Sequence, residues 1–172
     1  MGSTSPNVMT SKQKQFLDLI AWSEGTSTNR LTKHGGYDVV VSGPDGPEVF
    51  TDFRDHPFAQ GRPAKLVRAG HDGVGAIYST ASGRYQLLLR YWRAYQGMLH
   101  LPDFSPASQD AVALRQIREQ GADSAIEAGD IEDAIFKCAN IWASLPGNTY
   151  KQGGHTAEEL VAQYKTLEGT NV

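Results

Sequence analysis

The sequence predicts an α+β fold, in which a small antiparallel β element follows one helix and precedes several more. Three observations lead to this prediction. Apolar residues recur with helical spacing from about Ser11, β-branched and aromatic residues flank a turn-rich segment at residues 42–47, and helical spacing returns from about Tyr85. Strands that are segregated from helices in this way are typical of the α+β class. Its natural functional site is a cleft between a small β lobe and a mostly helical lobe.

Local signals place the helices. The first helix is expected to end at Gly25, and Ser105 followed by Pro106 is typical of a helix start. Thr156 and Glu159 form a capping box for the last helix. The expected helices cover about residues 11–24, 85–99, 105–120, 124–128, 130–142 and 156–168.

The strand signals lie between the first and second helices. Two strands are expected at residues 37–41 and 49–53, joined by the turn cluster at residues 42–47, which is longer than a two-residue hairpin loop. A third short strand is expected at residues 76–80. Residues 55–75 are rich in Gly, Pro, His and Arg without a clear period, so we expect a loop or lid there.

Composition limits the domain count and the classes of partner. The length of 172 residues indicates a single domain, over residues 11–172, and the turn- and loop-forming residues 1–10 indicate a flexible leader. With 40% hydrophobic and 20% charged residues, the composition is that of a globular protein. A net charge of −3 argues against a nucleic-acid partner. The single cysteine, Cys138, excludes an internal disulfide and is expected to be buried. Scattered histidines and missing nucleotide-binding loops indicate no metal and no cofactor.

The sequence contains no signal for export or membrane insertion. No apolar run is long enough to span a bilayer, and residues 1–14 lack the apolar stretch of a secretory signal. We therefore expect a protein that is made in the cytoplasm and is not stably inserted in a membrane.

Glu24 stands where the first helix ends, beside Trp22. The partial negative charge at the C-terminal end of a helix disfavours a carboxylate, and an apolar neighbour adds desolvation. Both effects raise the pKa of a carboxyl group, which suits a general acid at neutral pH. A glutamate near a helix end is also common as a solvated surface residue, so the neighbouring motifs decide between these interpretations.

Two further segments gather aromatic, amide and hydroxyl groups at element ends. They are residues 82–87 and residues 140–150, and the second contains Ser144. Sugar rings stack on aromatic faces, and their hydroxyl and acetamido groups need paired donors and acceptors. Trp92 and Trp142 are expected in the core, whereas tyrosines at element edges are candidates for a glycan-binding cleft. These tyrosines are Tyr37, Tyr78, Tyr85 and Tyr150.

These segments belong to a series of strings that resembles the bacteriophage lambda endolysin family, the phage lytic transglycosylases with a lysozyme-like fold. The resemblance extends from about Phe16 to Leu167 and includes the string Trp-Ser-Glu-Gly-Thr around Glu24. The strings lie at residues 16–26, 36–39, 50–53, 55–57, 83–88, 103–106, 108–114 and 140–147. Two parts depart from the family pattern, because residues 58–76 form a longer segment and the leader is unlike that of the lambda protein.

The resemblance implies roles for individual residues. Glu24 would be the catalytic acid, and Tyr85 and Gln86 would line the glycan cleft. Tyr150 would face the sugar, and Asp38 would lie near the cleft without acting as a nucleophile. The implied substrate is the glycan strand of peptidoglycan.

The resemblance also implies a mechanism. Glu24 would protonate the glycosidic oxygen between N-acetylmuramic acid and N-acetylglucosamine, through an oxocarbenium-like transition state. It would then take the proton of the muramic C6 hydroxyl, whose oxygen closes on C1 to give a 1,6-anhydro end. A holin would open the membrane, so that this protein, expected as a monomer, reaches the wall in the periplasm from the host cytoplasm.

Three other interpretations stay open at this stage. A hydrolytic muramidase would use the same substrate with a second carboxylate, for which Asp38 or Asp52 is available. A non-catalytic glycan-binding module would keep the aromatic residues but have no use for Glu24. A helical interaction domain would use the same motifs only as core.

Overall fold

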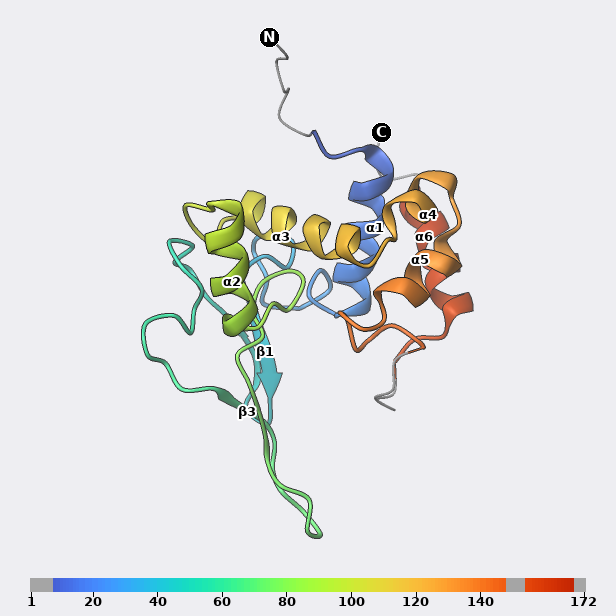
Figure 1. Ribbon diagram of the computed structural model, residues 1–172. Coiled ribbons are helices and arrows are strands. Elements are labelled where there is room, and N and C mark those ends of the chain that lie inside the picture. The colour runs from blue at the N-terminus through green and yellow to red at the C-terminus, as the bar shows by residue number, and fades with distance from the viewer. Residues whose placement is uncertain (1–7, 148–153, 169–172) are drawn as a thin grey trace. The chain divides into compact units, whose positions relative to one another are not determined.

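The computed structural model describes residues 8–147 and 154–168, drawn in colour in Figure 1. The chain forms two compact units. The first comprises residues 1–23 and 116–172, and the second comprises residues 24–115.

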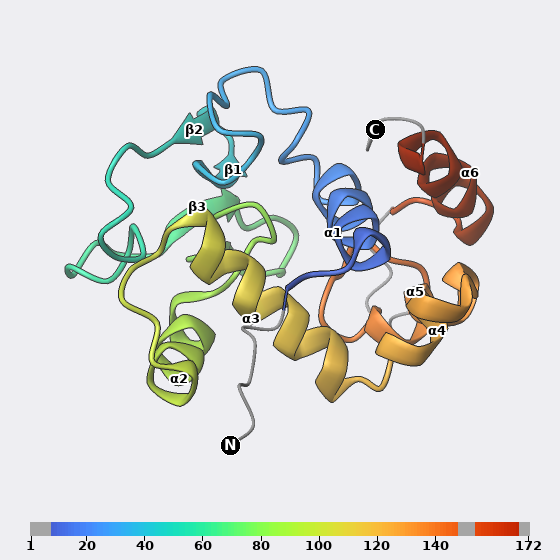
Figure 2. The ribbon, with the colours of Figure 1, turned by 90° about the horizontal axis from the view of Figure 1, so that it is seen from above.

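Four helices form the described part of the first unit, apart from the end of α3 (Pro106–Glu119), which begins in the second. They are α1 (Ser11–Ser23), α4 (Asp123–Ala128), α5 (Ile131–Cys138) and α6 (Ala157–Glu168). Helix α1 contacts α4 and α6, and α5 also contacts both, as the view in Figure 2 shows. Apolar side chains at helical spacing on α1 are buried here: Phe16, Leu17, Leu19 and Ile20. Helix α1 thus packs its apolar side chains into the core of this unit.

Capping residues define the ends of these helices. Thr156 and Glu159 form the expected capping box: the Glu159 backbone N–H donates to Thr156 Oγ1 at 3.1 Å, and the Thr156 N–H donates to the Glu159 carboxylate at 3.2 Å. A second box, missed in the sequence, starts α1. Thr10 Oγ1 accepts from the Gln13 N–H at 3.1 Å, and Gln13 Oε1 accepts from the Thr10 N–H at 2.9 Å. Thr10 therefore caps α1, although it was assigned to the leader.

Helix α5 is shorter than expected. It ends at Cys138 rather than near Trp142, because the chain turns there and the Ile141 N–H donates to the Cys138 carbonyl. Cys138 and Trp142 are both buried, as predicted, whereas Ile141 is only half-buried. Burial raises the pKa of the Cys138 thiol to about 12.

The second unit contains two antiparallel hairpins and helix α2 (Leu89–Leu99). Strand β1 (Val39–Gly43) pairs with β2 (Gly46–Val49), and β3 (Lys65–Arg68) pairs with β4 (Ile77–Ser79). Strands β1 and β3 also contact each other. The expected α+β order of helix, small β element and further helices is therefore confirmed.

The first hairpin is tighter than the sequence indicated. Gly43 pairs with Gly46, so the connection has two residues, and the expectation of a longer loop was wrong. The second strand ends at Val49, although the Phe50 N–H still donates to the Asp38 carbonyl at 2.8 Å. Beyond this bond the chain departs from β1, and the rings of Phe50 and Phe53 pack together with centroids 4.9 Å apart. Tertiary packing of these two rings outweighs their strand propensity.

The second hairpin lies where a loop or lid was expected. Strand β3 was missed, and β4 matches the expected third strand. At the tip, His71 and Val74 exchange backbone hydrogen bonds of 2.9 and 2.7 Å, with Asp72 and Gly73 at positive φ between them. This hairpin extends from the rest of its unit in Figure 1, and its side chains at Val74, Ile77 and Tyr78 are exposed. A strand that buries neither face shows no alternating pattern in the sequence.

Helix α2 begins four residues later than expected. Gly83 and Gln86 have φ of 83° and 52°, so residues 83–88 form a turn instead of a first helical turn. The core next to α2 is aromatic: Trp92 and Phe104 are fully buried, with ring centroids 4.9 Å apart. Leu87 and Val112 complete this cluster.

Within the described part of the chain, no helix combines the length and the apolarity needed to cross a bilayer.

Candidate active site

Glu24 is the residue that follows α1, and its side chain is half-buried. Two contacts within the first unit define the end of this helix. Ser23 Oγ donates to Ser144 Oγ at 2.9 Å, and the Trp22 ring stacks on His155 with centroids 4.4 Å apart. The hydroxyl of Ser144, a predicted glycan ligand, thus accepts from the last residue of α1.

The segment after Glu24 folds back on itself. Thr26 is buried, and its Oγ1 donates to the Arg84 carbonyl at 2.6 Å. Gly36 lies against the Thr26 backbone so closely that an added Cβ would stand 2.8 Å from the Thr26 carbonyl carbon. With φ at +97°, Gly36 also has a backbone conformation that favours glycine. Both ends of this segment are therefore fixed within the second unit.

The buried carboxylate of Asp38 accepts hydrogen bonds from within the same segment. Its side chain is buried, and its two oxygens accept hydrogen bonds from Thr32 Oγ1 and from the Lys33 N–H, the latter at 3.0 Å. Thr32 Oγ1 in turn accepts from the Gly36 N–H at 2.8 Å. Asp38 thus takes part in the local structure of residues 32–38.

Tyr37 and Tyr85 meet at one carboxylate. Their hydroxyls donate to Asp110 Oδ1 at 2.8 and 2.6 Å, and their rings pack edge to face with centroids 6.2 Å apart. Burial raises the pKa of Tyr37 to about 12 and that of Tyr85 well above its ordinary value, so both hydroxyls are neutral donors. Through these bonds the segments that contain Tyr37 and Tyr85 are both attached to helix α3.

Arg84 covers this pair of rings. Its guanidinium carbon lies 5.1 Å from the Tyr37 centroid and 5.7 Å from that of Tyr85. Nη1 donates to Tyr85 Oη at 3.2 Å and Nε donates to the Gly35 carbonyl at 2.9 Å. The side chain of Gln109 supports the turn, because its Oε1 accepts from the Arg84 N–H at 2.9 Å. Sequence reasoning missed Arg84 and Asp110 as partners of the two tyrosines.

The other predicted ligands lie in different settings. Gln86 is half-buried, and its amide nitrogen donates to the carbonyls of Gly83 and Val39 at 3.0 and 3.4 Å. Tyr78 is 60% exposed on β4 of the projecting hairpin. Tyr150 lies outside the described residues. The structure therefore brings Tyr37 and Tyr85 together, whereas Tyr78 lies on the projecting hairpin.

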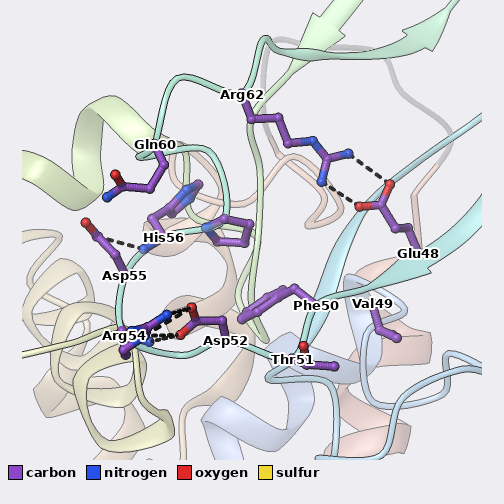
Figure 3. Close-up of a pocket in the computed structure, with 11 residues that line it drawn as sticks. Glu48, Val49, Phe50, Thr51, Asp52, Arg54, Asp55, His56, Gln60 and Arg62 are labelled. Carbon is purple, nitrogen blue, oxygen red and sulfur yellow. Dashed lines mark hydrogen bonds and ion pairs between the residues drawn. The ribbon is translucent and has the colours of Figure 1, made fainter.

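A separate hollow of about 790 Å³ lies in the second unit (Figure 3), lined by residues 48–52, 54–57, 60 and 62. Two ion pairs stand at its sides. Arg62 holds Glu48 through bonds of 2.7 and 2.9 Å and lowers the pKa of that carboxyl. Arg54 holds Asp52 at 2.7 Å and lowers the pKa of that carboxyl to about 2. Both carboxylates are thus ionised and paired at neutral pH.

His56 forms part of the wall of this hollow. Its Nε2 lies 2.8 Å from the Leu87 carbonyl, and its Nδ1 accepts from the Phe58 N–H at 3.2 Å, which together require the proton on Nε2. Burial lowers the pKa of His56, so the ring is neutral at pH 7. Both ring nitrogens serve the fold, and among the described residues no group of three potential metal ligands comes together.

Comparison with known proteins identifies the family. The endolysin family model matches residues 14–171. The chain is 56% identical over 156 residues to the endolysin of Escherichia phage P2, covering 90% of this chain and 91% of that relative. It is 51% identical over 160 residues to the endolysin of Escherichia phage lambda, with 92% of each chain covered.

Solved structures give the same result for the fold. Bacteriophage lambda lysozyme complexed with a chitohexasaccharide superposes with a TM-score of 0.81 at 48% identity, over 92% of this chain and 95% of that one. A second structure of lysozyme from bacteriophage lambda gives 0.75 at 48% identity, over 92% and 94%. The expected lysozyme-like α+β fold is confirmed, and the chain belongs to the endolysin family.

Proposed function

We propose that this endolysin is a lytic transglycosylase, which cleaves the β-1,4 bond between N-acetylmuramic acid and N-acetylglucosamine and leaves a 1,6-anhydro end. As a lysozyme-like endolysin the chain acts on peptidoglycan to lyse the cell. The finer question is which nucleophile attacks C1 of the muramic residue. Water needs a second carboxylate to hold it or to stabilise charge, whereas the muramic C6 hydroxyl does not.

The proposal rests on how Asp38 and Asp52, the two candidates for a second carboxylate, are bonded. Asp38 is buried, and both of its oxygens already accept hydrogen bonds from Thr32 and Lys33. Asp52 is on the surface and forms a bidentate pair with Arg54. A carboxylate that is committed to its own loop is a poor base for water, so this arrangement supports the intramolecular reaction.

In the proposed reaction Glu24 acts first as acid and then as base. It gives its proton to the glycosidic oxygen as the bond from that oxygen to C1 breaks. The Glu24 carboxylate then takes the proton of the C6 hydroxyl, and O6 forms the new bond to C1. One proton has moved from O6 to the departing oxygen, no water is consumed, and Glu24 is again protonated. Holding O6 and C1 in one molecule favours this closure over attack by bulk water.

The glycan ligands are part of the proposal. We assign this role to six side chains: Tyr37, Tyr78, Tyr85, Gln86, Ser144 and Tyr150. Asp38, which is buried and bonded within residues 32–38, would support the cleft through this loop. A chito-oligosaccharide bound to the lambda relative supports a glycan as the ligand class. We further propose that the protein acts as a monomer in the periplasm and depends on a holin for access to the wall.

A hydrolytic muramidase is the second candidate, because the two solved lambda relatives carry the name lysozyme. Digestion of purified cell wall in ¹⁸O-labelled water distinguishes the two reactions. A transglycosylase gives unlabelled products about 18 Da lighter than hydrolysed ends, because one water is missing. A hydrolytic muramidase on the same wall serves as the labelled control. Reducing ends that carry ¹⁸O as the main product would refute the proposal, and Asp38 would then be the next residue to mutate.

A further inference from the structure

We propose that Asp110 is a positioning residue of this enzyme: its carboxylate holds Tyr85, Tyr37 and, through Tyr85, Arg84, and these fix the segment that begins at Glu24. The inference rests on the proposed role of Glu24 as the catalytic acid. All of the residues concerned belong to the second unit.

The hydroxyls of Tyr37 and Tyr85 donate to the same carboxylate oxygen of Asp110. Asp110 Oδ1 accepts from Tyr85 Oη at 2.6 Å and from Tyr37 Oη at 2.8 Å. Hydrogen bonds to an ionised acceptor are short and roughly twice as strong as neutral ones. The edge-to-face contact of the two rings adds a second constraint on their orientation. Two loops that are distant in the sequence are thereby fixed to one position on α3.

Arg84 is connected to Asp110 through the hydroxyl of Tyr85. The Tyr85 oxygen accepts from Arg84 Nη1 at 3.2 Å and donates to Asp110, so the cation, the phenol and the carboxylate form one chain. Arg84 also stacks over Tyr37, and its Nε donates to the Gly35 carbonyl at 2.9 Å. The Arg84 guanidinium therefore bonds both to Tyr85, which Asp110 holds, and to Gly35, which precedes Tyr37 in the chain.

Arg84 in turn contacts the segment that follows Glu24, the proposed catalytic acid. The Arg84 carbonyl accepts from Thr26 Oγ1 at 2.6 Å, and Thr26 is two residues beyond Glu24. Gly36 packs on the backbone of Thr26 from the other side. Both ends of residues 26–37 are thus tied to the pair Arg84 and Tyr85. Loss of the Asp110 carboxylate would release the pair, and with it the backbone next to Glu24.

A positioning role predicts a specific kinetic pattern. A general acid must be held within about 0.5 Å of its productive position, and a displacement of about 1 Å costs about 10²-fold in rate. We expect Asp110→Ala to lower kcat by about that factor, whereas glycan binding, to which the released rings of Tyr37 and Tyr85 contribute, weakens by a smaller factor. A residue that only stabilises the fold would instead lower the amount of folded enzyme and leave kcat per folded molecule unchanged.

The experiment compares variants of the full chain well below their melting temperatures. Initial rates of product release from purified peptidoglycan give kcat and KM, and calorimetry with chitohexasaccharide in a Glu24→Gln background gives binding. Asp110→Asn is the conservative variant, because its Oδ1 still accepts from both phenols. Asp133→Ala is the matched control, since Asp133 is an exposed acid of α5 whose pairing with Lys137 is a surface contact.

The expected result is a kcat about 10²-fold lower for Asp110→Ala, hexasaccharide binding weakened by less than about tenfold, and recovery of kcat to within about tenfold of wild type in Asp110→Asn. Asp133→Ala should match the wild type. If Asp110→Ala keeps its kcat, or loses binding in proportion to kcat, the positioning role is refuted.

Two further arms keep the test decisive. If Asp110→Ala does not fold, Tyr85→Phe removes the shorter of the two phenol bonds, and an unchanged kcat in that variant would refute the proposal. Tyr91→Phe, at an exposed tyrosine on α2, is its control. If Glu24→Gln itself retains activity, the proposed function fails first. A dead Glu24→Gln enzyme beside a fully active Asp110→Ala enzyme rejects the positioning role alone.

Discussion

Substitution of Gly36 by alanine tests whether the segment after Glu24 is held by close backbone packing. A Cβ at this position would stand 2.8 Å from the carbonyl carbon of Thr26 and 3.0 Å from the amide nitrogen of Ser27. Both contacts are with backbone, which moves only if the whole segment moves. The residue also has φ at +97°, which alanine adopts at a cost of about 1–2 kcal/mol.

The structure offers controls that separate the two contributions. Gly46 has φ at +90° and open space around its Cβ position, so Gly46→Ala should lose only the conformational term of about 1–2 kcal/mol. Gly97, on α2, has open space and no positive φ, so Gly97→Ala should stabilise by about 0.5–1 kcal/mol. Overpacking adds about 1–3 kcal/mol, so Gly36→Ala should lose about 2–5 kcal/mol in total.

The assay is urea unfolding followed by tryptophan fluorescence, together with wall-lysis rates measured at 25 °C on the folded fraction. Because a shift of the Thr26 backbone is passed to Glu24, we expect Gly36→Ala to lose about tenfold in rate, while the other two variants keep theirs. If Gly36→Ala is no less stable than Gly46→Ala, the clash is relieved at no cost. Gly36 would then not hold the segment after Glu24 in place.

Three further changes have defined outcomes. Glu24→Gln keeps the size of the side chain but cannot donate a proton at neutral pH, so lysis should fall by at least about 10²-fold with little change in melting temperature; activity above a tenth of wild type would contradict the assignment. Burial raises the pKa of the Cys138 thiol to about 12, so alkylation at pH 8 should require urea, and rapid labelling of the folded protein would contradict this. Burial lowers the pKa of His56 below 6.5, so the free energy of unfolding should fall as the pH drops below about 6.5. In urea titrations at several pH values, His56→Gln should reduce this dependence of stability on pH. An equal dependence in both proteins would mean that other groups cause it.

Helix positions were largely predictable because their signals are local. The Thr156 and Glu159 box, the Ser105–Pro106 start and the end of α1 before Gly25 each depend on residues within one turn of each other. The position of Glu24 directly after α1 was predictable for the same reason, whereas its proposed role came from the family resemblance.

The strands were harder to place because their bounds depend on distant partners. Phe50 and Phe53 have high strand propensity, yet the strand ends before them at Val49. Their rings pack with each other, and Phe50 also packs on Phe104. Strand β3 pairs with a segment a dozen residues later and buries neither face, so its sequence carries no alternation. Propensity therefore predicted that strands exist here but not where they begin and end.

Asp110 could not be identified from the sequence by any local argument. On helix α3 it has the pattern of an ordinary solvated acid, and its meaning comes from Tyr37 and Tyr85, which lie 73 and 25 residues away. The two tyrosines were assigned to glycan binding from their aromatic character and their place at element edges, and Tyr85 also from the family resemblance. The structure places both hydroxyls on this carboxylate. A phenol engaged in this way can present its ring to a sugar while its oxygen holds the loop. Variants that remove only the hydroxyl, Tyr37→Phe and Tyr85→Phe, should therefore lower kcat, whereas removal of a ring should also weaken glycan binding. Equal effects of phenylalanine and alanine on binding would mean that the rings do not contact the glycan and that both tyrosines act only through Asp110.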